Sequence, residues 1–467
     1  MLQFDPGPRV DLWARLMETV ERYLRSVDNQ RVAPELDPAA IRASLAAYDF
    51  NQAQDAIAAL DFASEGLKQW QVHTPHARYF GLFNPASTTM GIAADTLAAA
   101  FNCQLAAWSH SPFAVEVENH LVRAFGARFG YDANSVDGVF ASGGAEANHT
   151  AAIAALTHAF PDFVELGVRA LTGRPVMYAS AECHHSFLKA ARMCGLGQSA
   201  LRAIPVDAKL RLDPRELSIA IAKDRQAGRH PFLVIATAGT TNAGAIDPLP
   251  EMAKIAARER LWFHVDAAWG GAAALSPSLR PLIAGMEAAD SITFDAHKWL
   301  SVPMGAGLFL TRHRDILHRA FRTETAYMPK EGEGLDIVDP HLHSMQWSRR
   351  FIGLKVFLSL AEAGWDGYAR AIDHMTAMGA LLRRELGGRG WHVVNETPLP
   401  VVCFVDDGGA DSREIARRVV ASGKAWISTT VLASSRVALR ACITNFRTAE
   451  ADIHALVDLL DETRAAR

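Results

Sequence analysis

Residues 291–300 read SITFDAHKWL, and this stretch is the most informative in the chain. The apolar run Ser291–Phe294 predicts a buried strand, and an acid, a histidine and a lysine follow it directly. Lysines are seldom buried unless they are used or paired, and removal from water favours the neutral amine that can form a Schiff base. A surface lysine whose stem packs on the protein is the plainer alternative for Lys298 taken alone.

Short apolar runs of the same kind recur on both sides of this stretch. They predict six more strands, at Gly138–Ala141, Pro175–Ala179, Leu201–Val206, Phe232–Thr237, Leu261–Val265 and Ala306–Leu310. Helical patterns separate several of them, at Glu146–Ala159, Ser186–Cys194 and Leu249–Arg258. Strands that alternate with helices predict an α/β domain built on a mostly parallel sheet.

The rest of the chain divides around this domain. Residues 1–85 have apolar positions at helical spacing, such as Leu12, Leu16 and Val20, and predict an N-terminal helical segment. Residues 86–350 form the predicted large α/β domain. Residues 351–467 open with a helical stretch at Phe351–Ala363 and continue with WHVV, LPVVCFV and VALRACI, which predict a small α+β domain.

Composition excludes several classes of function. Of 467 residues, 49% are hydrophobic and 21% charged, and the formal net charge is −4, so nothing favours a nucleic-acid or anionic-membrane partner. The N-terminus lacks the pattern of a secretory signal, and no apolar run reaches the roughly 18 residues of a membrane span. Five scattered cysteines indicate neither a disulfide framework nor a zinc site. We expect a cytoplasmic protein.

A glycine-containing turn lies between a predicted strand and a predicted helix. Ala141–Asn148 reads ASGGAEAN. Small residues let the backbone approach an anion, and a helix N-terminus offers unpaired N–H groups to a phosphate. Alone, the turn is weak evidence, because many such turns bind nothing and this one is neither a P-loop nor a dinucleotide fingerprint.

Two further motifs place ionisable residues at predicted strand ends. Ser180–Ser186 reads SAECHHS, where His184 can stack on a planar cofactor or move a proton, although a helix-entry turn capped by Ser186 is the plainer alternative. Phe263–Gly271 reads FHVDAAWGG. A carboxylate at Asp266 can keep a pyridine nitrogen protonated, which makes the ring an electron sink, and Ala268 is small enough to underlie a flat ring. A helix cap explains Asp266 alone equally well.

The four motifs together describe one kind of site. A phosphate-binding turn, a histidine, an aspartate and a lysine occur in that order, and they are the parts that a pyridoxal 5′-phosphate site needs. We therefore predict this cofactor and expect no metal.

At these residues the sequence resembles the group II pyridoxal-dependent decarboxylases of fold type I. That family includes glutamate, aromatic amino acid, cysteine sulfinate and diaminobutyrate decarboxylases. SGGAEAN, HVDAAWGG and DAHKWL are typical of it, and the resemblance runs from about His73 to the C-terminus. The motifs VEVE at 115–118 and RRFIGLK at 349–355 are also similar. The resemblance implies a small-molecule amino acid substrate and an obligate homodimer with swapped N-terminal helices and shared active sites.

The resemblance also assigns the residues that would hold the cofactor. Lys298 would bind it as a Schiff base, and His297 would contact its phosphate. Gly144 and Ala145 would belong to the phosphate-binding turn.

Around the ring and the substrate the resemblance implies five further roles. Asp266 would pair with the pyridine nitrogen. Ala268 and His184 would lie against opposite faces of the ring, with Thr240 nearby. Arg440 would receive the substrate carboxylate.

Two features depart from the family pattern. Relatives usually carry a tyrosine on a mobile loop that returns a proton to Cα, but residues 335–344 read LDIVDPHLHS. His341 stands at or next to the expected position, and Tyr327 lies upstream. Asp295 stands where relatives often have asparagine, and an acid near a phosphate is repelled unless it is paired or points elsewhere.

We therefore expect decarboxylation of an L-amino acid to the amine and carbon dioxide, with His341 as the proton donor because histidine donates near neutral pH. Relatives without the tyrosine can instead form aldehydes oxidatively, so this outcome stays an alternative. A carbon–carbon lyase of the same fold and a catalytically silent cofactor-binding regulator are two more. A transaminase fits the motifs less well.

Overall fold

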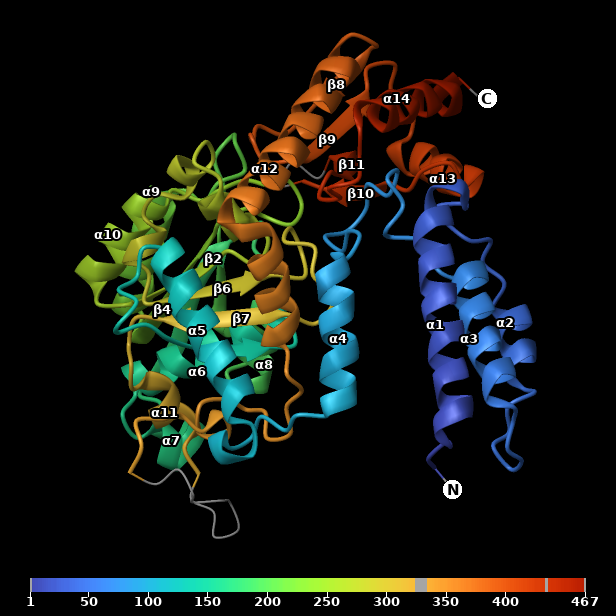
Figure 1. Ribbon diagram of the computed structural model, residues 1–467. Helices are drawn as coiled ribbons and strands as arrows, with labels where there is room; N and C mark the ends of the chain where they lie inside the picture. Colours follow the sequence, from blue (N-terminus) through green and yellow to red (C-terminus); the bar gives the residue numbers. More distant parts are fainter. Residues whose placement is uncertain (1, 324–333, 433–435, 466–467) are drawn as a thin grey trace.

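The computed structural model describes residues 2–323, 334–432 and 436–465, and these fall into three structural parts (Figure 1). The N-terminal helices α1 (Pro6–Ser26), α2 (Pro38–Leu45) and α3 (Ala56–Trp70) stand beside the body of the molecule. A large α/β part and a smaller C-terminal part make up the rest. Aspartate side chains begin several helices: Asp37 and Asp55, for example, accept backbone N–H groups in the first turns of α2 and α3.

A seven-stranded sheet forms the centre of the large part. Its strands are β1 (Asp137–Ala141), β2 (Arg174–Ser180), β3 (Leu201–Ile204), β4 (Arg229–Thr237), β5 (Trp262–Asp266), β6 (Ser291–Asp295) and β7 (Gly307–Thr311). They lie in the order β1-β7-β6-β5-β4-β2-β3. Only β7 runs antiparallel to its neighbours, β1 and β6. The predicted α/β class with a mostly parallel sheet is confirmed.

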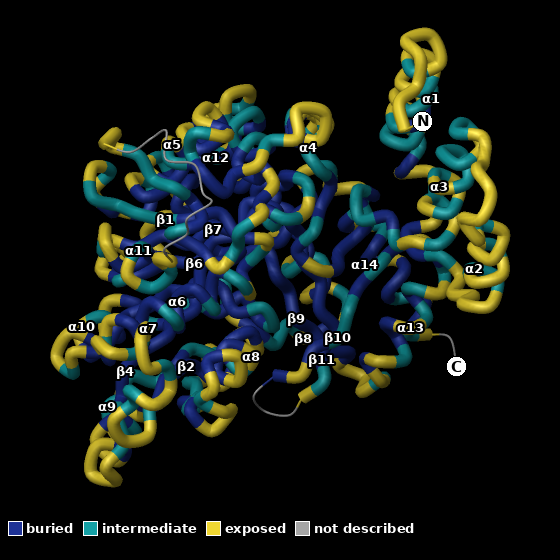
Figure 2. The backbone as a smooth tube through the Cα atoms, turned by 90° about the horizontal axis from the view of Figure 1, so that it is seen from below, coloured by how far each residue is buried: buried dark blue, intermediate teal, exposed yellow. Residues whose placement is uncertain are grey.

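Both faces of this sheet are covered by helices, which is why its strands read as continuous apolar runs. Alternate residues serve opposite faces: Phe309 packs in one core cluster, and Leu308 and Leu310 pack in the other. The helices on the first face are α6 (Gly144–Ala159), α8 (Ser186–Met193) and α11 (Ile316–Phe321). Those on the second are α5 (Pro112–Arg128), α9 (Pro214–Gln226), α10 (Leu249–Glu259) and α12 (Gly353–Gly387). Figure 2 shows these strands buried.

The C-terminal part is a four-stranded antiparallel sheet in the order β10-β11-β9-β8. Its strands are β8 (Trp391–Val393), β9 (Val401–Asp406), β10 (Ser428–Val431) and β11 (Val437–Cys442), and it packs with α13 (Ser412–Ser422) and α14 (Glu450–Ala465). The sequence patterns mark three of the four strands. They miss β10, an edge strand of sequence STTV that lacks an apolar run.

Helix α12 joins the two sheet-containing parts. The sequence predicts a helix at Phe351–Ala363, but α12 extends to Gly387 and contacts both α4 (Thr89–Phe101) and α14. At Gly364 the backbone leaves helical geometry with φ = 64°, a conformation that glycine adopts without a steric penalty. The sequence pattern ends at this break, although the chain continues as a helix beyond it.

No single helix in the described part of the chain is long and apolar enough to cross a membrane; α6 with the bent segment 163–170 passes that test only as a pair.

Candidate active site

Six strands of the large sheet have their carboxyl ends at one edge. Strands β2, β3, β4, β5 and β6 are parallel, and β1 points the same way because β7 lies antiparallel between it and β6. In open α/β sheets, ligands bind at this edge. Eight of the ten residues predicted for the site follow these strands or end them, namely Gly144, Ala145, His184, Thr240, Asp266, Ala268, His297 and Lys298. A ninth, Arg440, comes from the small sheet and contacts the loop after β4.

Lys298 follows β6 and lies against an acid from the end of the same strand. Its Nζ is 3.0 Å from Oδ2 of Asp295, whose side chain is 1% exposed. His297 Nε2 lies 3.9 Å from the same oxygen. The second oxygen of Asp295 is buried and has no hydrogen-bond partner among the described residues. The acid that departs from the family pattern is thus paired with the lysine.

The phosphate-binding turn approaches this group closely. A Cβ on Gly144 would lie 2.8 Å from Oδ2 of Asp295 and 3.3 Å from Cβ of Ala268, so only glycine fits there without displacement. Helix α6 begins at Gly144, and the first N–H groups of a helix have no acceptor within it. His297 lies beside the turn, accepts a hydrogen bond from Ala306 N–H at Nδ1, and has its pKa lowered by burial.

Asp266 ends β5 and is held by hydrogen bonds from two sides. Its Oδ1 accepts the N–H of Ala268 at 3.1 Å, and its Oδ2 accepts Nδ2 of Asn148 at 2.9 Å. Asp266 is buried, and Asn148 lies on α6, four residues beyond Gly144. The carboxylate is therefore fixed in place before any ligand binds, as electrostatic preorganisation requires.

Asn148 also connects Asp266 to His184. The second hydrogen bond of its Nδ2 goes to Ser186 Oγ at 2.9 Å, and Ser186 Oγ lies 2.9 Å from His184 Nδ1. Ser186 and Asn148 are buried, whereas His184 is exposed in the single chain. Ser186 is more than the helix cap that its position suggested, because its hydroxyl links two predicted site residues.

Arg440, on β11 of the small sheet, reaches the loop after β4. Its Nε donates to the carbonyl of Thr241 and its Nη1 to that of Gly81, and its guanidinium lies 5.0 Å from the ring centre of Phe83. Its Nη2 is buried without a partner among the described residues. Thr240 is buried, and its Oγ1 accepts the N–H of Ala245 within its own loop.

His341, the predicted proton donor, lies away from these contacts. Its backbone N–H donates to the carbonyl of Ala106, its Nδ1 lies 3.0 Å from that oxygen, and its ring stands 5.0 Å from that of Trp347. Among the described residues, none of these His341 contacts is with Lys298, so its role stays a prediction. Tyr327 lies outside the described residues.

The two other family-like motifs meet in a structural ion pair. Arg349 Nη2 lies 2.7 Å from Glu118 Oε2, both side chains are 4% exposed, and Gly353 N–H donates to Glu118 Oε1. Burial raises the pKa of Glu118, and the charge of Arg349 opposes that rise. The pair joins α5 to the start of α12 and supplies no group to the strand edge.

These residues fit pyridoxal phosphate. The N-terminus of α6 at Gly144 offers an anion N–H groups that have no acceptor within the helix, and the buried Nη2 of Arg440 lacks, among the described residues, the acceptor that a carboxylate would provide. Lys298 and Asp266 supply the amine and the carboxylate at the same strand edge. No group of three or more histidine, cysteine, aspartate or glutamate side chains suited to a metal occurs in the described ranges.

The chain is similar to known proteins in sequence and in fold. A family model described as the pyridoxal-dependent decarboxylase conserved domain matches residues 38–406. An aromatic-L-amino-acid decarboxylase of Bacillus atrophaeus is 29% identical over 461 residues, or 96% of this chain and 93% of that protein. A cysteine sulfinic acid decarboxylase of Mus musculus is 33% identical over 338 residues, or 72% of this chain and 68% of that one. The structure of Oryza sativa TDC with PLP and tryptamine superposes with a TM-score of 0.91 at 27% identity and covers 99% of both chains.

The fold and the strand-edge site therefore define an α/β enzyme of the pyridoxal-phosphate-dependent class. The chain belongs to the pyridoxal-dependent decarboxylase family. It is a carboxy-lyase that acts on an amino acid with pyridoxal 5′-phosphate as cofactor, which confirms the family, the reaction class and the cofactor predicted from the motifs.

The sequence analysis missed two polar residues of the site, Asn148 and Ser186. The signal for Asn148 was an amide on a helix face otherwise made of alanines, since Ala147, Ala151 and Ala155 are all buried. A buried amide needs partners, so such a residue in an apolar stripe indicates a hydrogen-bond network.

Proposed function

We propose that this enzyme converts an L-amino acid to its amine by the residues gathered at the strand edge. The observation that carries the assignment is the joint placement of Lys298, Asp266 and the turn at Gly144 at the carboxyl ends of β6, β5 and β1. When bound, the cofactor supplies an electron sink for the pair released as the Cα–carboxylate bond breaks.

The chain's own residues bind, orient and hold charge. Lys298 would hold the cofactor, Asp266 would keep the pyridine nitrogen protonated, and the N-terminus of α6 with His297 would hold the phosphate. Ala268 and His184 would lie on the two ring faces, and Thr240 near the ring. Arg440 would orient the substrate through its unpaired Nη2, which offers a charge-assisted hydrogen bond to the carboxylate.

The final proton transfer decides between an amine and an aldehyde. We assign it to His341, because the described part of the loop, 334–344, holds histidines and no tyrosine. Nδ1–H donates to the carbonyl of Ala106, so Nε2 is the nitrogen left for proton transfer, and it gives a proton to Cα from the cationic form of the ring. Oxygen-dependent aldehyde formation is the second candidate, and the missing tyrosine favours it.

Product analysis by mass spectrometry tests both candidates. The holoenzyme is offered a panel of aromatic and acidic amino acids, the two substrate classes in the names of its relatives. We expect one of them to yield its amine with carbon dioxide, and His341→Ala to lower kcat about 10²-fold with little change in KM. Ammonia with an aldehyde would establish the second candidate. An unchanged rate and unchanged products in the variant would remove His341 from the reaction.

The N-terminal helices support a homodimer. Helix α1 exposes Val10, Trp13 and Met17, which are 62%, 54% and 56% exposed, on an element that stands beside the body. Large apolar side chains in one exposed group mark an interaction surface. We propose that a second copy of the chain covers them and that the two copies share their active sites.

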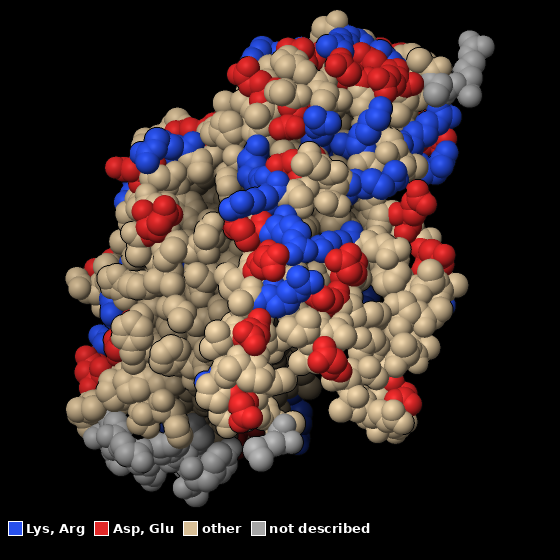
Figure 3. All heavy atoms as spheres, turned by 45° about the vertical axis from the view of Figure 1, so that its right-hand side comes forward, with Lys and Arg blue, Asp and Glu red and all other residues tan. Residues whose placement is uncertain are grey.

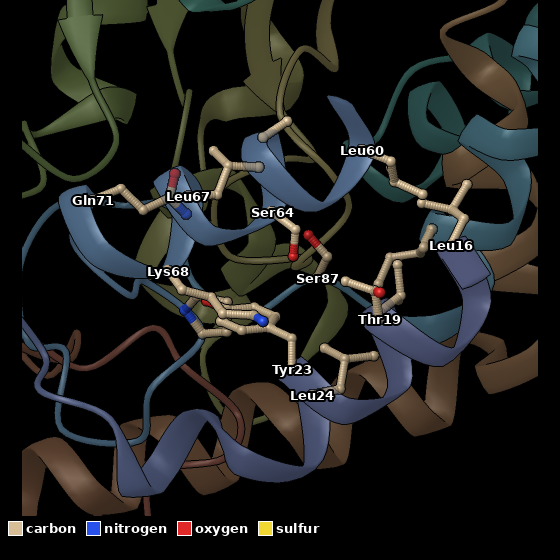
Figure 4. Close-up of a pocket in the computed structure, with 14 residues that line it drawn as sticks. Leu16, Thr19, Tyr23, Leu24, Leu60, Ser64, Leu67, Lys68, Gln71 and Ser87 are labelled. Carbon is tan, nitrogen blue, oxygen red and sulfur yellow. The ribbon is translucent and has the colours of Figure 1, made fainter. Parts of the chain in front are cut away.

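An apolar cavity next to these helices is consistent with that partner. Its volume is about 400 Å³, and side chains of α1 and α3 point into it together with Ser87, which precedes α4 (Figure 4). Ile92 of α4 also lines it. In Figure 3 a broad area without charged side chains lies beside a band in which basic and acidic ones mix. Low charge favours a buried contact between copies.

We also propose a domain division, an absence of two kinds of partner, and a location in the cell. The domain division is 1–85, 86–350 and 351–467. Neither nucleic acid nor membrane is a partner. The cytoplasm is the location, supported by five cysteines that are all free thiols in the structure.

A further inference from the structure

The hydrogen-bond network beneath Asp266 begins at a group that can only donate. Trp262 Nε1–H donates to Ser291 Oγ at 2.8 Å, and Ser291 Oγ lies 2.8 Å from His264 Nδ1. An indole nitrogen has no acceptor capacity, so the serine oxygen accepts there and its own hydrogen is free for His264. Nδ1 of His264 accepts that hydrogen, because the carboxylate of Asp266 takes the Nδ2 hydrogen of Asn148 and so leaves Asn148 Oδ1 to accept from His264 Nε2.

The proton of neutral His264 then lies on Nε2, which faces Asn148 Oδ1 at 3.2 Å, with Thr293 Oγ1 at 3.4 Å. Burial lowers the pKa of His264 to about 4, so the ring is neutral near pH 7. A carboxylate at Asp266 can only accept, and it takes a hydrogen of Asn148 Nδ2. The carboxylate of Asp266 therefore fixes the orientation of the Asn148 amide, with Nδ2 toward Asp266 and Oδ1 toward His264.

The second hydrogen of Asn148 Nδ2 goes to Ser186 Oγ, so the Ser186 hydrogen is free to point to His184 Nδ1. The backbone N–H of Ser186 also donates to Nδ1, at 3.2 Å. Two donors therefore face one nitrogen of His184. A hydroxyl can rotate away from a protonated Nδ1, but a backbone N–H cannot.

We infer that this network holds His184 as the neutral tautomer with its proton on Nε2, so that His184 meets the substrate as a hydrogen-bond donor and not as a base. Asn148 and Ser186 act as positioning residues for it. The meaning for catalysis rests on the proposed function, but the position of the proton does not.

The charged and titratable groups that act on His184 are Asp266, Lys298, His185 and Asp295. Although His184 is exposed in the single chain, the protein around its ring removes part of its water, which lowers its pKa, and the two carboxylates oppose that change. Ser186→Ala removes one donor from Nδ1 and makes the cation easier to form, and Asn148→Leu removes the partner that leaves the Ser186 hydrogen to Nδ1. We therefore expect Asn148→Leu and Ser186→Ala to raise the pKa of His184, shifting its protonation equilibrium about tenfold.

Nitrogen-15 NMR of histidine-labelled protein tests the inference, with His184→Gln to assign the signal. We expect Nε2 protonated and Nδ1 unprotonated between pH 6 and 8, with and without pyridoxal phosphate. The control is Ser359→Ala, which removes an equally buried hydroxyl that bonds to Thr88 Oγ1 at 2.7 Å, outside the network. It should leave the His184 signal unchanged.

A proton on Nδ1 of wild-type His184 near pH 7 would overturn the inference, as would wild-type titration in both network variants. If either variant fails to fold, the wild-type tautomer still decides the matter. Because the spectrum needs no turnover, an enzyme that fails to decarboxylate can still show the tautomer, and an active enzyme can still contradict it.

Discussion

The side chains at the strand edge and those on the N-terminal helices differ in where their partners come from. At the strand edge, buried polar groups find most of their partners within the chain: Asp266, Asn148 and His264 are each 0–4% exposed and all are hydrogen-bonded. On α1, Trp13 and Met17 remain more than half exposed. A buried polar group needs its hydrogen-bond partners as soon as the chain folds. An exposed apolar side chain can be covered later, when a partner molecule binds.

The difference predicts that each region can be damaged without the other. Variants at the strand edge should change chemistry in an intact assembly, and variants on α1 should change assembly first.

Lys298→Ala should have the largest effect, because it removes the only group assigned to bind the cofactor covalently. We expect turnover to be lost while the protein keeps the mass of a dimer. Borohydride reduction followed by mass spectrometry should add the cofactor to the wild-type chain and not to the variant. Lys254→Ala, at an exposed lysine of α10, serves as control. Full activity in Lys298→Ala would exclude the assignment.

The double substitution Trp13→Glu with Met17→Glu should weaken dimerisation about 10³-fold, since two buried apolar contacts of roughly 2 kcal/mol each are replaced by charges. Sedimentation velocity should show the 50.7-kDa chain in place of a species of twice that mass. Leu166→Glu, at a residue 50% exposed on α7 (Phe163–Leu166), is the matched control. A double variant that stays dimeric would remove α1 from the interface.

Arg440→Met should raise KM about 10- to 100-fold, because a hydrogen bond to a charged group contributes about 1.5–3 kcal/mol. Arg383→Met removes a half-buried guanidinium, which donates to the carbonyls of Asn395 and Val401. The control should lose stability but keep its KM. Equal KM values in the two variants would refute substrate binding by Arg440.

The smallest effect concerns stability against pH. Below about pH 6.5 the unfolded chain binds a proton at His264, whereas the folded protein does so only near pH 4, so stability is lost as pH falls through this window. Between pH 6.5 and 5.5 the loss is about 1 kcal/mol. Urea unfolding of wild type and His264→Gln measures it, because other groups cancel in the comparison. Identical pH slopes would show that His264 is protonated in the folded protein.

The sequence predicted most of the fold because its strands are covered on both faces and therefore read as apolar runs. All seven strands of the large sheet occur where such runs predict them, whereas β10, short, polar and at an edge, has no such run. The second half of α12 was likewise not predicted, because Gly364 interrupts the helical pattern and a glycine there indicates the end of a helix.

Of the site, the sequence by itself determined which motifs follow strand ends, and from these motifs it predicted Lys298, Asp266, His184 and the turn at Gly144. Only the tertiary structure decided what surrounds them. Asn148, Ser186 and His264 come from three separate elements, and the pairing of Asp295 with Lys298 depends on a turn of the backbone after β6. The physical reason is that hydrogen bonds and ion pairs need a contact within about 3 Å, and sequence patterns report burial and period but not such distances.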